Sequence, residues 1–226
     1  STLFNCLSNS KAHSANFPFC TIEPNIGRVN VPDERLKRLT DLINPKQTIP
    51  ASIEIVDIAG LVKGASKGEG LGNQFLANIR ETDALIHVLR CFEDSNITHV
   101  EGKINPLRDK EIIDLELQIK DLQTVDKQIE KVSKKLKAGD KDHVKNLSVL
   151  QMIKNKLEKS ENLRTLNMGE DEANLIKDLN LLTLKPVLYV CNVSEQDLNN
   201  GNDFTNQIKE MITREKCEIL ILAISL

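Results

Sequence analysis

Residues 53–62 of this chain read Ile53-Glu54-Ile55-Val56-Asp57-Ile58-Ala59-Gly60-Leu61-Val62, and a glycine-rich run from Lys63 to Gly72 follows them. The alternating β-branched residues predict a buried strand, and the glycines predict a mobile loop that receives the carboxylate at the strand's end. Phosphoryl-transfer sites need this arrangement, because Asp57 would hold Mg²⁺ while the Gly60 amide would bond the γ-phosphate. Any strand can end in Asp-x-x-Gly, so the prediction depends on the neighbouring motifs.

The composition of the 226-residue chain disfavours several classes of protein. With a net charge of −3, 3% aromatic residues and no tryptophan, it indicates neither a polyanion partner nor a base-stacking platform. No run of 18 apolar residues and no signal peptide occurs, so no membrane association is predicted. Five widely spaced cysteines without a Cys-x-x-Cys pair indicate reduced thiols in a cytoplasmic protein rather than a zinc site. They are Cys6, Cys20, Cys91, Cys191 and Cys217.

Residues 1–7 predict the first turns of an amphipathic helix that has no cap. This start is explained if Gly-x-x-x-x-Gly-Lys precedes Ser1. Ser1 would then complete a phosphate-binding loop, with its hydroxyl on Mg²⁺. The alternative is a surface serine at a ragged end. Because the chain does not begin with methionine, we expect a segment before Ser1.

A proline-bounded loop at 16–25 carries one threonine near its middle, Thr21. A sensor of the γ-phosphate needs a hydroxyl and a backbone amide on a loop that can order and disorder, and Thr21 is the candidate. The alternative is a packed loop anchored by Phe17 and Phe19, and both interpretations can hold together.

Further strands and helices alternate along the chain. Strands are expected at 26–31, 84–92, 186–191 and 218–224, and helices after Pro32-Asp33, at 74–81 and at 204–215. Such continuous apolar strands predict a parallel sheet covered on both faces. Ligands bind at the carboxyl ends of these strands, where Asp57, Asn192 and Ala223 lie. His87, inside an apolar strand, is either a core histidine or a catalytic one.

From Asp109 the pattern changes to long helices. Apolar residues recur at steps of three and four in two series that Gly139-Asp140 separates, which predicts an antiparallel coiled coil inserted into a globular domain. Ten lysines and four acids lie between Lys127 and Lys159, a local excess of six positive charges. Such a lysine-rich face is either simply solvated or a contact for RNA phosphates. The series are Ile112, Leu115, Ile119, Leu122, Val125, Ile129, Val132 and Leu136, then Val144, Leu147, Leu150, Ile153 and Leu157.

Several stretches together resemble the Obg-like ATPase (YchF) subfamily of translation-factor-class P-loop GTPases, over essentially the whole chain. The resemblance implies an α/β P-loop NTPase G domain with a mostly parallel sheet, plus an inserted antiparallel coiled-coil domain. It also implies Mg²⁺-dependent nucleotide hydrolysis in the cytoplasm and association with ribosomes, through the large subunit. The stretches are Ser1-Thr2-Leu3-Phe4-Asn5, residues 16–25, 57–65 and 68–73, and Asn192-Val193-Ser194-Glu195.

The resemblance implies a division into domains. Residues 1–108 would form the first part of the G domain, with the start of the phosphate loop and two switch regions. Residues 109–180 would form the helical insert, and residues 181–226 the base-recognition strand and the last strand. The phosphate-loop glycines and lysine would precede Ser1, and a TGS domain would follow Leu226. Catalysis is therefore attributed to the full-length protein only.

The tetrapeptide Asn192-Val193-Ser194-Glu195 stands where guanine-specific members of the superfamily have Asn-Lys-x-Asp. Valine replaces the lysine, and glutamate carries its carboxylate one methylene further out. A displaced carboxylate loses much of its hold on the guanine edge, so we predict adenine over guanine, as the resemblance also implies. The last base contact would come from Ala223-Ile224-Ser225, which departs from the usual Ser-Ala-Lys.

Leu61 stands where a Ras-like enzyme would place the glutamine that orients water. Its side chain has no donor or acceptor, so the water-orienting residue is not identified and slow turnover is expected.

The predicted site places Thr21, Asp57 and Asn192 around one cavity. Three functions are open: an ATPase switch with weaker GTP use that controls ribosome association, an ordinary GTPase, and a non-catalytic coiled-coil scaffold with vestigial nucleotide binding. Ser1, Thr21 and Asp57 are the predicted Mg²⁺ ligands. The predicted nucleotide-binding residues are Ser1, Thr2, Thr21, Asp57, Gly60, Asn192, Val193, Glu195, Ala223, Ile224 and Ser225.

Overall fold

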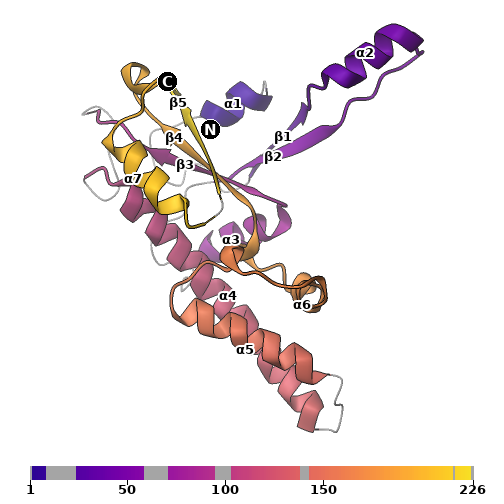
Figure 1. Cartoon of the computed structure of the whole chain (residues 1–226), viewed down its shortest axis with the longest axis vertical. Coiled ribbons are helices and arrows are strands. Elements are labelled where there is room, and N and C mark those ends of the chain that lie inside the picture. Colours follow the sequence, from indigo (N-terminus) through magenta and orange to yellow (C-terminus); the bar gives the residue numbers. More distant parts are fainter. Residues whose placement is uncertain are drawn as a thin grey trace. The chain divides into compact units, whose positions relative to one another are not determined.

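The structure is a computed structural model that describes residues 2–8, 24–58, 71–94, 103–137, 143–215 and 217–224 (Figure 1). The chain divides into two compact units, residues 1–60 and residues 61–225. Within the described ranges, no helix combines the length and the apolar character that crossing a membrane requires.

The first unit is built on an antiparallel pair of strands. It contains α1 (Thr2–Ser8), β1 (Asn25–Asn30), α2 (Glu34–Ile43) and β2 (Ser52–Asp57). Asn25 of β1 lies opposite Asp57 of β2. Gly27 is buried where α1 packs on β1, and an added Cβ would lie 2.4 Å from the Cβ of Ser8. Only glycine therefore allows α1 to approach the strand this closely.

The helix predicted after Pro32-Asp33 is confirmed as α2. The Asp33 carboxylate accepts a hydrogen bond from the Arg35 amide at 2.9 Å and caps the helix, and Asn44 ends it in the left-handed conformation. The apolar side of α2 is exposed, with Leu42 at 81% and Ile43 at 67%.

The strand that ends in Asp57 differs from prediction in its burial. Residues 52–54 are exposed and residues 55–57 are half-buried, whereas the β-branched run predicted a buried strand. Ile53 is 52% exposed. The physical reason is that β2 pairs only with β1 in the part of the chain that the structure describes.

The second unit holds a three-stranded parallel sheet in the order β3-β4-β5, which confirms the predicted parallel pairing for these strands, whereas β1 and β2 pair antiparallel. Its strands are β3 (Leu85–Arg90), β4 (Val187–Asn192) and β5 (Glu218–Leu222), and its helices are α3 (Leu71–Glu81), α4 (Pro106–Lys137), α5 (Val144–Glu158), α6 (Glu170–Ile176) and α7 (Asp203–Ile212). Short 3₁₀ helices lie at η2 (Leu163–Thr165), η3 (Lys177–Leu179), η4 (Leu182–Leu184) and η5 (Glu195–Asp197).

One face of this sheet forms a core with α7 and the start of α4. Tyr189 and Ile208 are fully buried in that core. On the opposite face Ile86, Val88 and Leu220 are 44–48% exposed, whereas Val190 of β4 is 2% exposed, so the cover predicted for both faces is incomplete there. The reason is that α4 and α7, the helices that pack on the sheet, share one core on one side.

The helices α4 and α5 form the predicted antiparallel hairpin (Figure 1). Its distal core contains Val125 and Val132 of α4 and Leu150 and Ile153 of α5, all of them at predicted apolar positions. The expected break at Gly139-Asp140 lies outside the described residues. The three-and-four spacing therefore predicted this half of the insert correctly.

The proximal half of α4 differs from prediction. Leu115, expected on the apolar face, is 47% exposed, whereas Lys110 and Asp114 are buried and paired with each other. Lys110 Nζ also donates to Glu215 Oε1 at 2.7 Å, and Arg164 Nη1 donates to Glu215 Oε2 at 2.8 Å. This half of α4 faces the sheet rather than α5, so a polar cluster replaces the apolar seam.

Candidate functional site

The ends of the three parallel strands are joined by hydrogen bonds at one edge of the sheet. The Cys91 amide donates to the Asn192 carbonyl at 2.7 Å, and the Val193 amide donates to the Leu222 carbonyl at 2.9 Å. The Asn192 Oδ1 atom accepts from the Ile224 amide at 2.9 Å. Asn192 therefore holds the loop after β4 against the loop after β5, the two loops in which base-binding residues were predicted.

The tetrapeptide 192–195 divides its side chains between the core and the surface. Val193 is 3% exposed and belongs to the core of the sheet. Glu195 is the first residue of η5, and its side chain is exposed. The carboxylate of Glu195 is therefore accessible to a ligand, while Val193 contributes packing. Ala223 and Ile224 lie half-buried directly after β5.

The predicted phosphate-side residues belong to the first unit. Thr2 is the first residue of α1, and Asp57 is the last residue of β2; both are half-buried. Ser1, Thr21, Gly60 and Ser225 lie outside the described residues, as does Leu61. The prediction that Thr21, Asp57 and Asn192 line one cavity stays a prediction.

A cavity of about 400 Å³ lies beneath α2 in the first unit, and none of the predicted site residues lines it. Asn30, at one end of β1, borders the cavity, whereas Asp57 pairs with Asn25 at the other end. At about 3.4 Å per residue the two ends are roughly 17 Å apart. We therefore do not place the nucleotide in this cavity.

The residues proposed for Mg²⁺ have suitable chemistry. Mg²⁺ prefers hard oxygen ligands and usually keeps several waters, so one carboxylate with hydroxyl and phosphate oxygens can hold it. The half-buried Asp57 at a strand's end supplies such a carboxylate. Across the described ranges there is no group of three or more His, Cys, Asp and Glu side chains that could hold a metal.

Two titratable groups near the sheet are shielded from solvent, the half-buried His87 and the buried Cys91. Burial lowers the pKa of His87 to about 4, so its imidazole is neutral at pH 7. Its ring lies 5.6 Å from the ring of Tyr189 on the covered face, which favours the core role. The neighbouring Cys191 thiol, together with burial, raises the pKa of Cys91, so Cys91 stays protonated.

The sequence analysis did not identify two residues that follow the tetrapeptide 192–195, Asp197 and Asn202. The Asn202 side chain donates to the Cys91 carbonyl at 2.7 Å and to Asp197 Oδ2 at 2.9 Å. A sequence signal existed, because Asn202 followed three residues later by Thr205 is a helix-start pattern. The hydrogen bond from Asn202 to the Cys91 carbonyl spans 111 residues of sequence and leaves no such local signal.

Comparison with known proteins gives consistent matches. Residues 1–193 match the family model described as "50S ribosome-binding GTPase". The chain is 50% identical over 224 residues to the "Ribosome-binding ATPase YchF" of Bacillus subtilis, covering 98% of this chain and 61% of that protein. It is 52% identical over 215 residues to the protein of the same name from Escherichia coli O157:H7, covering 95% and 59%.

A solved structure agrees with these relatives. It is titled "Structure of the Schizosaccharomyces pombe YchF GTPase", with a TM-score of 0.77, 36% identity, and coverage of 99% of this chain and 62% of that one. The chain spans about three fifths of the length of the relatives it matches. The expected P-loop GTPase fold, with its parallel sheet and long helical insert, and the resemblance to YchF proteins are confirmed.

Proposed function

Because this chain belongs to the 50S ribosome-binding GTPase family, we propose that it is the nucleotide-binding part of a cytoplasmic, ribosome-associated protein that hydrolyses ATP. Its relatives are named ribosome-binding ATPases, at about half identity over nearly the whole chain. The observation that carries the proposal is the edge of the parallel sheet, where Asn192 joins the loops after β4 and β5 and Glu195 is exposed beside them.

The same edge supports adenine as the preferred base. A guanine site needs a carboxylate fixed in place to accept two hydrogen bonds from the base edge. Glu195 instead carries its carboxylate on a longer, exposed side chain, and Val193 turns into the core. A base site that cannot pair the guanine donors rejects guanine, because unpaired polar groups cost more than lost packing. Ala223, Ile224 and Ser225 would complete the base contacts.

On the phosphate side, Ser1, Thr2, Thr21 and Gly60 would bind the triphosphate, with Asp57, Ser1 and Thr21 holding Mg²⁺. Bound Mg²⁺ would neutralise charge on the phosphate oxygens. Asp57 is the last residue of β2, and its side chain is half-buried. The three-part division into residues 1–108, 109–180 and 181–226 follows the same proposal, with the hairpin as an insert between the two parts of the G domain.

Hydrolysis by the full-length protein tests this assignment. Asp57→Asn should abolish Mg²⁺-dependent ATP hydrolysis, while circular dichroism and the melting temperature stay near those of the parent protein. Asp203→Asn, a surface aspartate of α7, is the matched control and should hydrolyse ATP normally. Undiminished hydrolysis by Asp57→Asn would remove Asp57 from the site.

An ordinary GTPase is the second candidate function. It is favoured by the descriptions of the matching family and of the fission yeast structure, both of which name GTPases. Tighter binding of GTP than of ATP by the same protein would select it.

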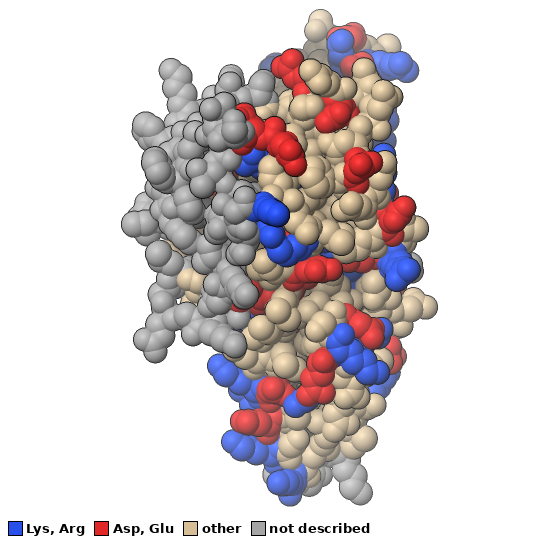
Figure 2. Space-filling view, turned by 90° about the vertical axis from the view of Figure 1, so that its left-hand side faces the viewer, with Lys and Arg blue, Asp and Glu red and all other residues tan. Residues whose placement is uncertain are grey.

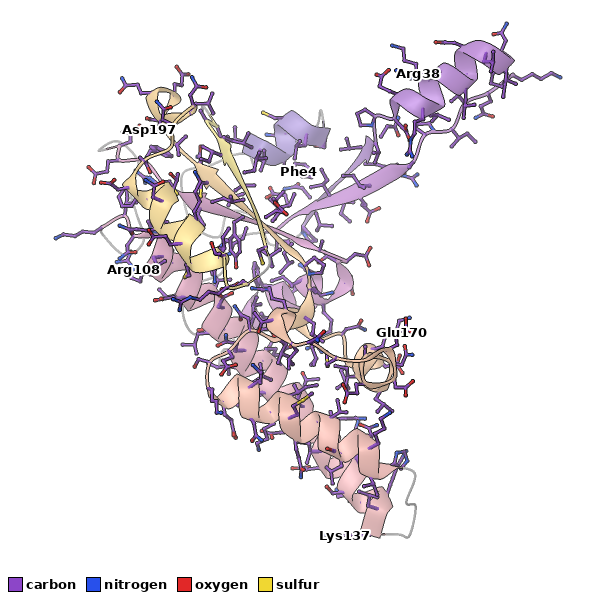
Figure 3. The ribbon with its side chains drawn as sticks, in the orientation of Figure 1. Phe4, Arg38, Arg108, Lys137, Glu170 and Asp197 are labelled. Carbon is purple, nitrogen blue, oxygen red and sulfur yellow. The ribbon has the colours of Figure 1, made fainter. Side chains whose placement is uncertain are left out.

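The ribosome contact is proposed for the lysines of α4. Lys127, Lys131 and Lys134 are exposed and spaced four and three residues apart, so they share one side of the helix. Among the described residues, none of the three forms an ion pair, whereas Lys154 and Lys156 of α5 are paired with acids. Figure 3 shows Lys137 at the end of the same helix. In Figure 2, basic and acidic side chains are interspersed at the lower end of the molecule.

This lysine stripe would contact ribosomal RNA phosphates, with the large subunit as the expected target. Replacing Lys127, Lys131 and Lys134 with alanine should weaken co-sedimentation with ribosomes. It should also reduce the slope of log affinity against log salt by about two to three. The control is the alanine triple at Lys145, Lys154 and Lys156, which removes the same charge from residues that already have acidic partners. Equal effects of the two triples would contradict a specific stripe.

A further inference from the structure

We propose that Asp197 and Asn202 are positioning residues for nucleotide-base recognition, which fix the loop 193–201 that presents Glu195 at the edge of the sheet. The inference rests on the proposed function, because it assigns the base to this edge. Neither residue belongs to the tetrapeptide or to the loop after β5. Figure 3 shows Asp197 on the segment between β4 and α7.

The Asn202 side chain makes three hydrogen bonds. Its Oδ1 atom accepts from the Thr205 amide at 3.1 Å, which caps α7. Its Nδ2 atom donates to the Cys91 carbonyl at 2.7 Å and to Asp197 Oδ2 at 2.9 Å. An amide offers two donor hydrogens. Here one bonds Cys91, directly after β3, and the other bonds Asp197 in the loop 193–201. The group is therefore held in a single orientation.

Asp197 extends this chain of contacts to the tetrapeptide. Its Oδ2 atom also accepts from Ser194 Oγ at 3.0 Å, and Ser194 directly precedes Glu195. The Asp197 carbonyl accepts from the Gly201 amide at 2.7 Å, which closes the loop into a turn. A continuous path thus runs from β3 through Asn202 and Asp197 to the residue beside Glu195.

A capping role alone does not account for these contacts. A helix cap needs only an acceptor oxygen, which Ser or Asp supplies as well as Asn. The two Nδ2 bonds contribute nothing to the cap. One goes to Cys91, whose amide donates to the Asn192 carbonyl at the edge of the sheet, and the other goes to Asp197. They order a loop that is exposed at Glu195, Gln196 and Leu198. Ordering such a loop before a ligand binds lowers the entropic cost of binding.

The experiment separates the cap from the bridge in the full-length protein. Asn202→Ser keeps a capping oxygen and removes both Nδ2 bonds, whereas Asn202→Ala removes all three. Asp197→Ala removes the carboxylate oxygen that accepts from both Ser194 and Asn202. Asp197→Asn keeps one side-chain oxygen as an acceptor. Asp203→Ala, an exposed neighbouring acid, is the control. Calorimetric titration with Mg²⁺–ATP and with Mg²⁺–GTP gives the ratio of the two dissociation constants, and thermal unfolding reports stability.

The expected result is a loss of base discrimination by about tenfold in Asn202→Ser and Asp197→Ala, since each loses about two hydrogen bonds. The melting temperature of Asn202→Ser should stay near that of the parent protein. Asn202→Ala should melt at a lower temperature and lose as much base discrimination as Asn202→Ser. Asp197→Asn should retain most of the parent's ratio of the ATP and GTP dissociation constants, and Asp203→Ala should leave that ratio unchanged.

Other outcomes overturn one claim or both. If the parent discriminates and Asn202→Ser discriminates equally well, the inference fails and the proposed function stands. An equal weakening of ATP and GTP binding, with the ratio unchanged, would mean a structural role only. A parent protein that binds neither nucleotide, or both equally, overturns the proposed base site and the inference with it.

Discussion

The pH dependence of stability should report the partial burial of His87. This histidine lies on the covered face of β3, with its ring 5.6 Å from that of Tyr189. Burial lowers its pKa from 6.5 to about 4, against smaller opposing influences. The Asp114 carboxylate raises the pKa, whereas Lys110 and Arg164 lower it. His87→Leu removes the titrating group and keeps an apolar side chain of similar size.

The size of this effect on the free energy of unfolding follows from the shift in the pKa of His87. Each pKa unit corresponds to about 1.4 kcal/mol, so the shift of His87 amounts to roughly 3 kcal/mol in full. Below pH 6.5 the unfolded chain binds a proton that the folded chain refuses until about pH 4. The stability associated with the neutral imidazole is therefore complete above pH 6.5 and is lost as the pH falls toward 4. Between pH 7.5 and 4.5 the parent should lose about 2.5 kcal/mol more than His87→Leu.

Urea unfolding at a series of pH values measures this difference. Val88→Ala, next to His87 on the exposed face of β3, is the control and should shift stability by the same amount at every pH. If the curves of the parent and of His87→Leu stay parallel from pH 7.5 to 4.5, the burial argument is refuted.

Three further substitutions test packing by thermal unfolding. Glu215→Gln should destabilise the protein by about 3 kcal/mol, because Lys110 and Arg164 lose the charge of a half-buried carboxylate partner; an unchanged melting temperature would contradict this. Asp121→Ala should cost about 3 kcal/mol, since this carboxylate accepts from two buried amides and a hydroxyl, and Asp121→Asn should cost less. Gly201→Ala should cost about 2 kcal/mol, because the φ of 69° strains any other residue and the new Cβ would meet a side-chain oxygen at 2.4 Å; full stability would refute that conflict.

Local periodicity predicted the elements that bury one continuous apolar face. The distal hairpin packs Val125 and Val132 against Leu150 and Ile153, at the spacing read from the sequence. The parallel strands were likewise predicted from apolar runs, which placed Asn192 at a strand's carboxyl end. Both signals arise within one element, so the sequence contains them directly.

Contacts between distant segments could not be predicted in the same way. Lys110 is buried because Glu215, 105 residues later, supplies its partner, and a lysine on a helix is ordinarily solvent-exposed. The amide of Asn202 reaches the Cys91 carbonyl across a comparable separation. Leu115 is exposed for the complementary reason, since the polar cluster occupies the inner side of α4. Pairing of this kind depends on tertiary structure, which no local period encodes.

The most direct test is a side-by-side calorimetric titration of the full-length protein with ATP and with GTP in the presence of Mg²⁺. We predict a dissociation constant for ATP at least about tenfold lower, as expected when a base site leaves the guanine donors unpaired. A lower dissociation constant for GTP would contradict the assignment of Asn192, Glu195 and the loop after β5 as an adenine site.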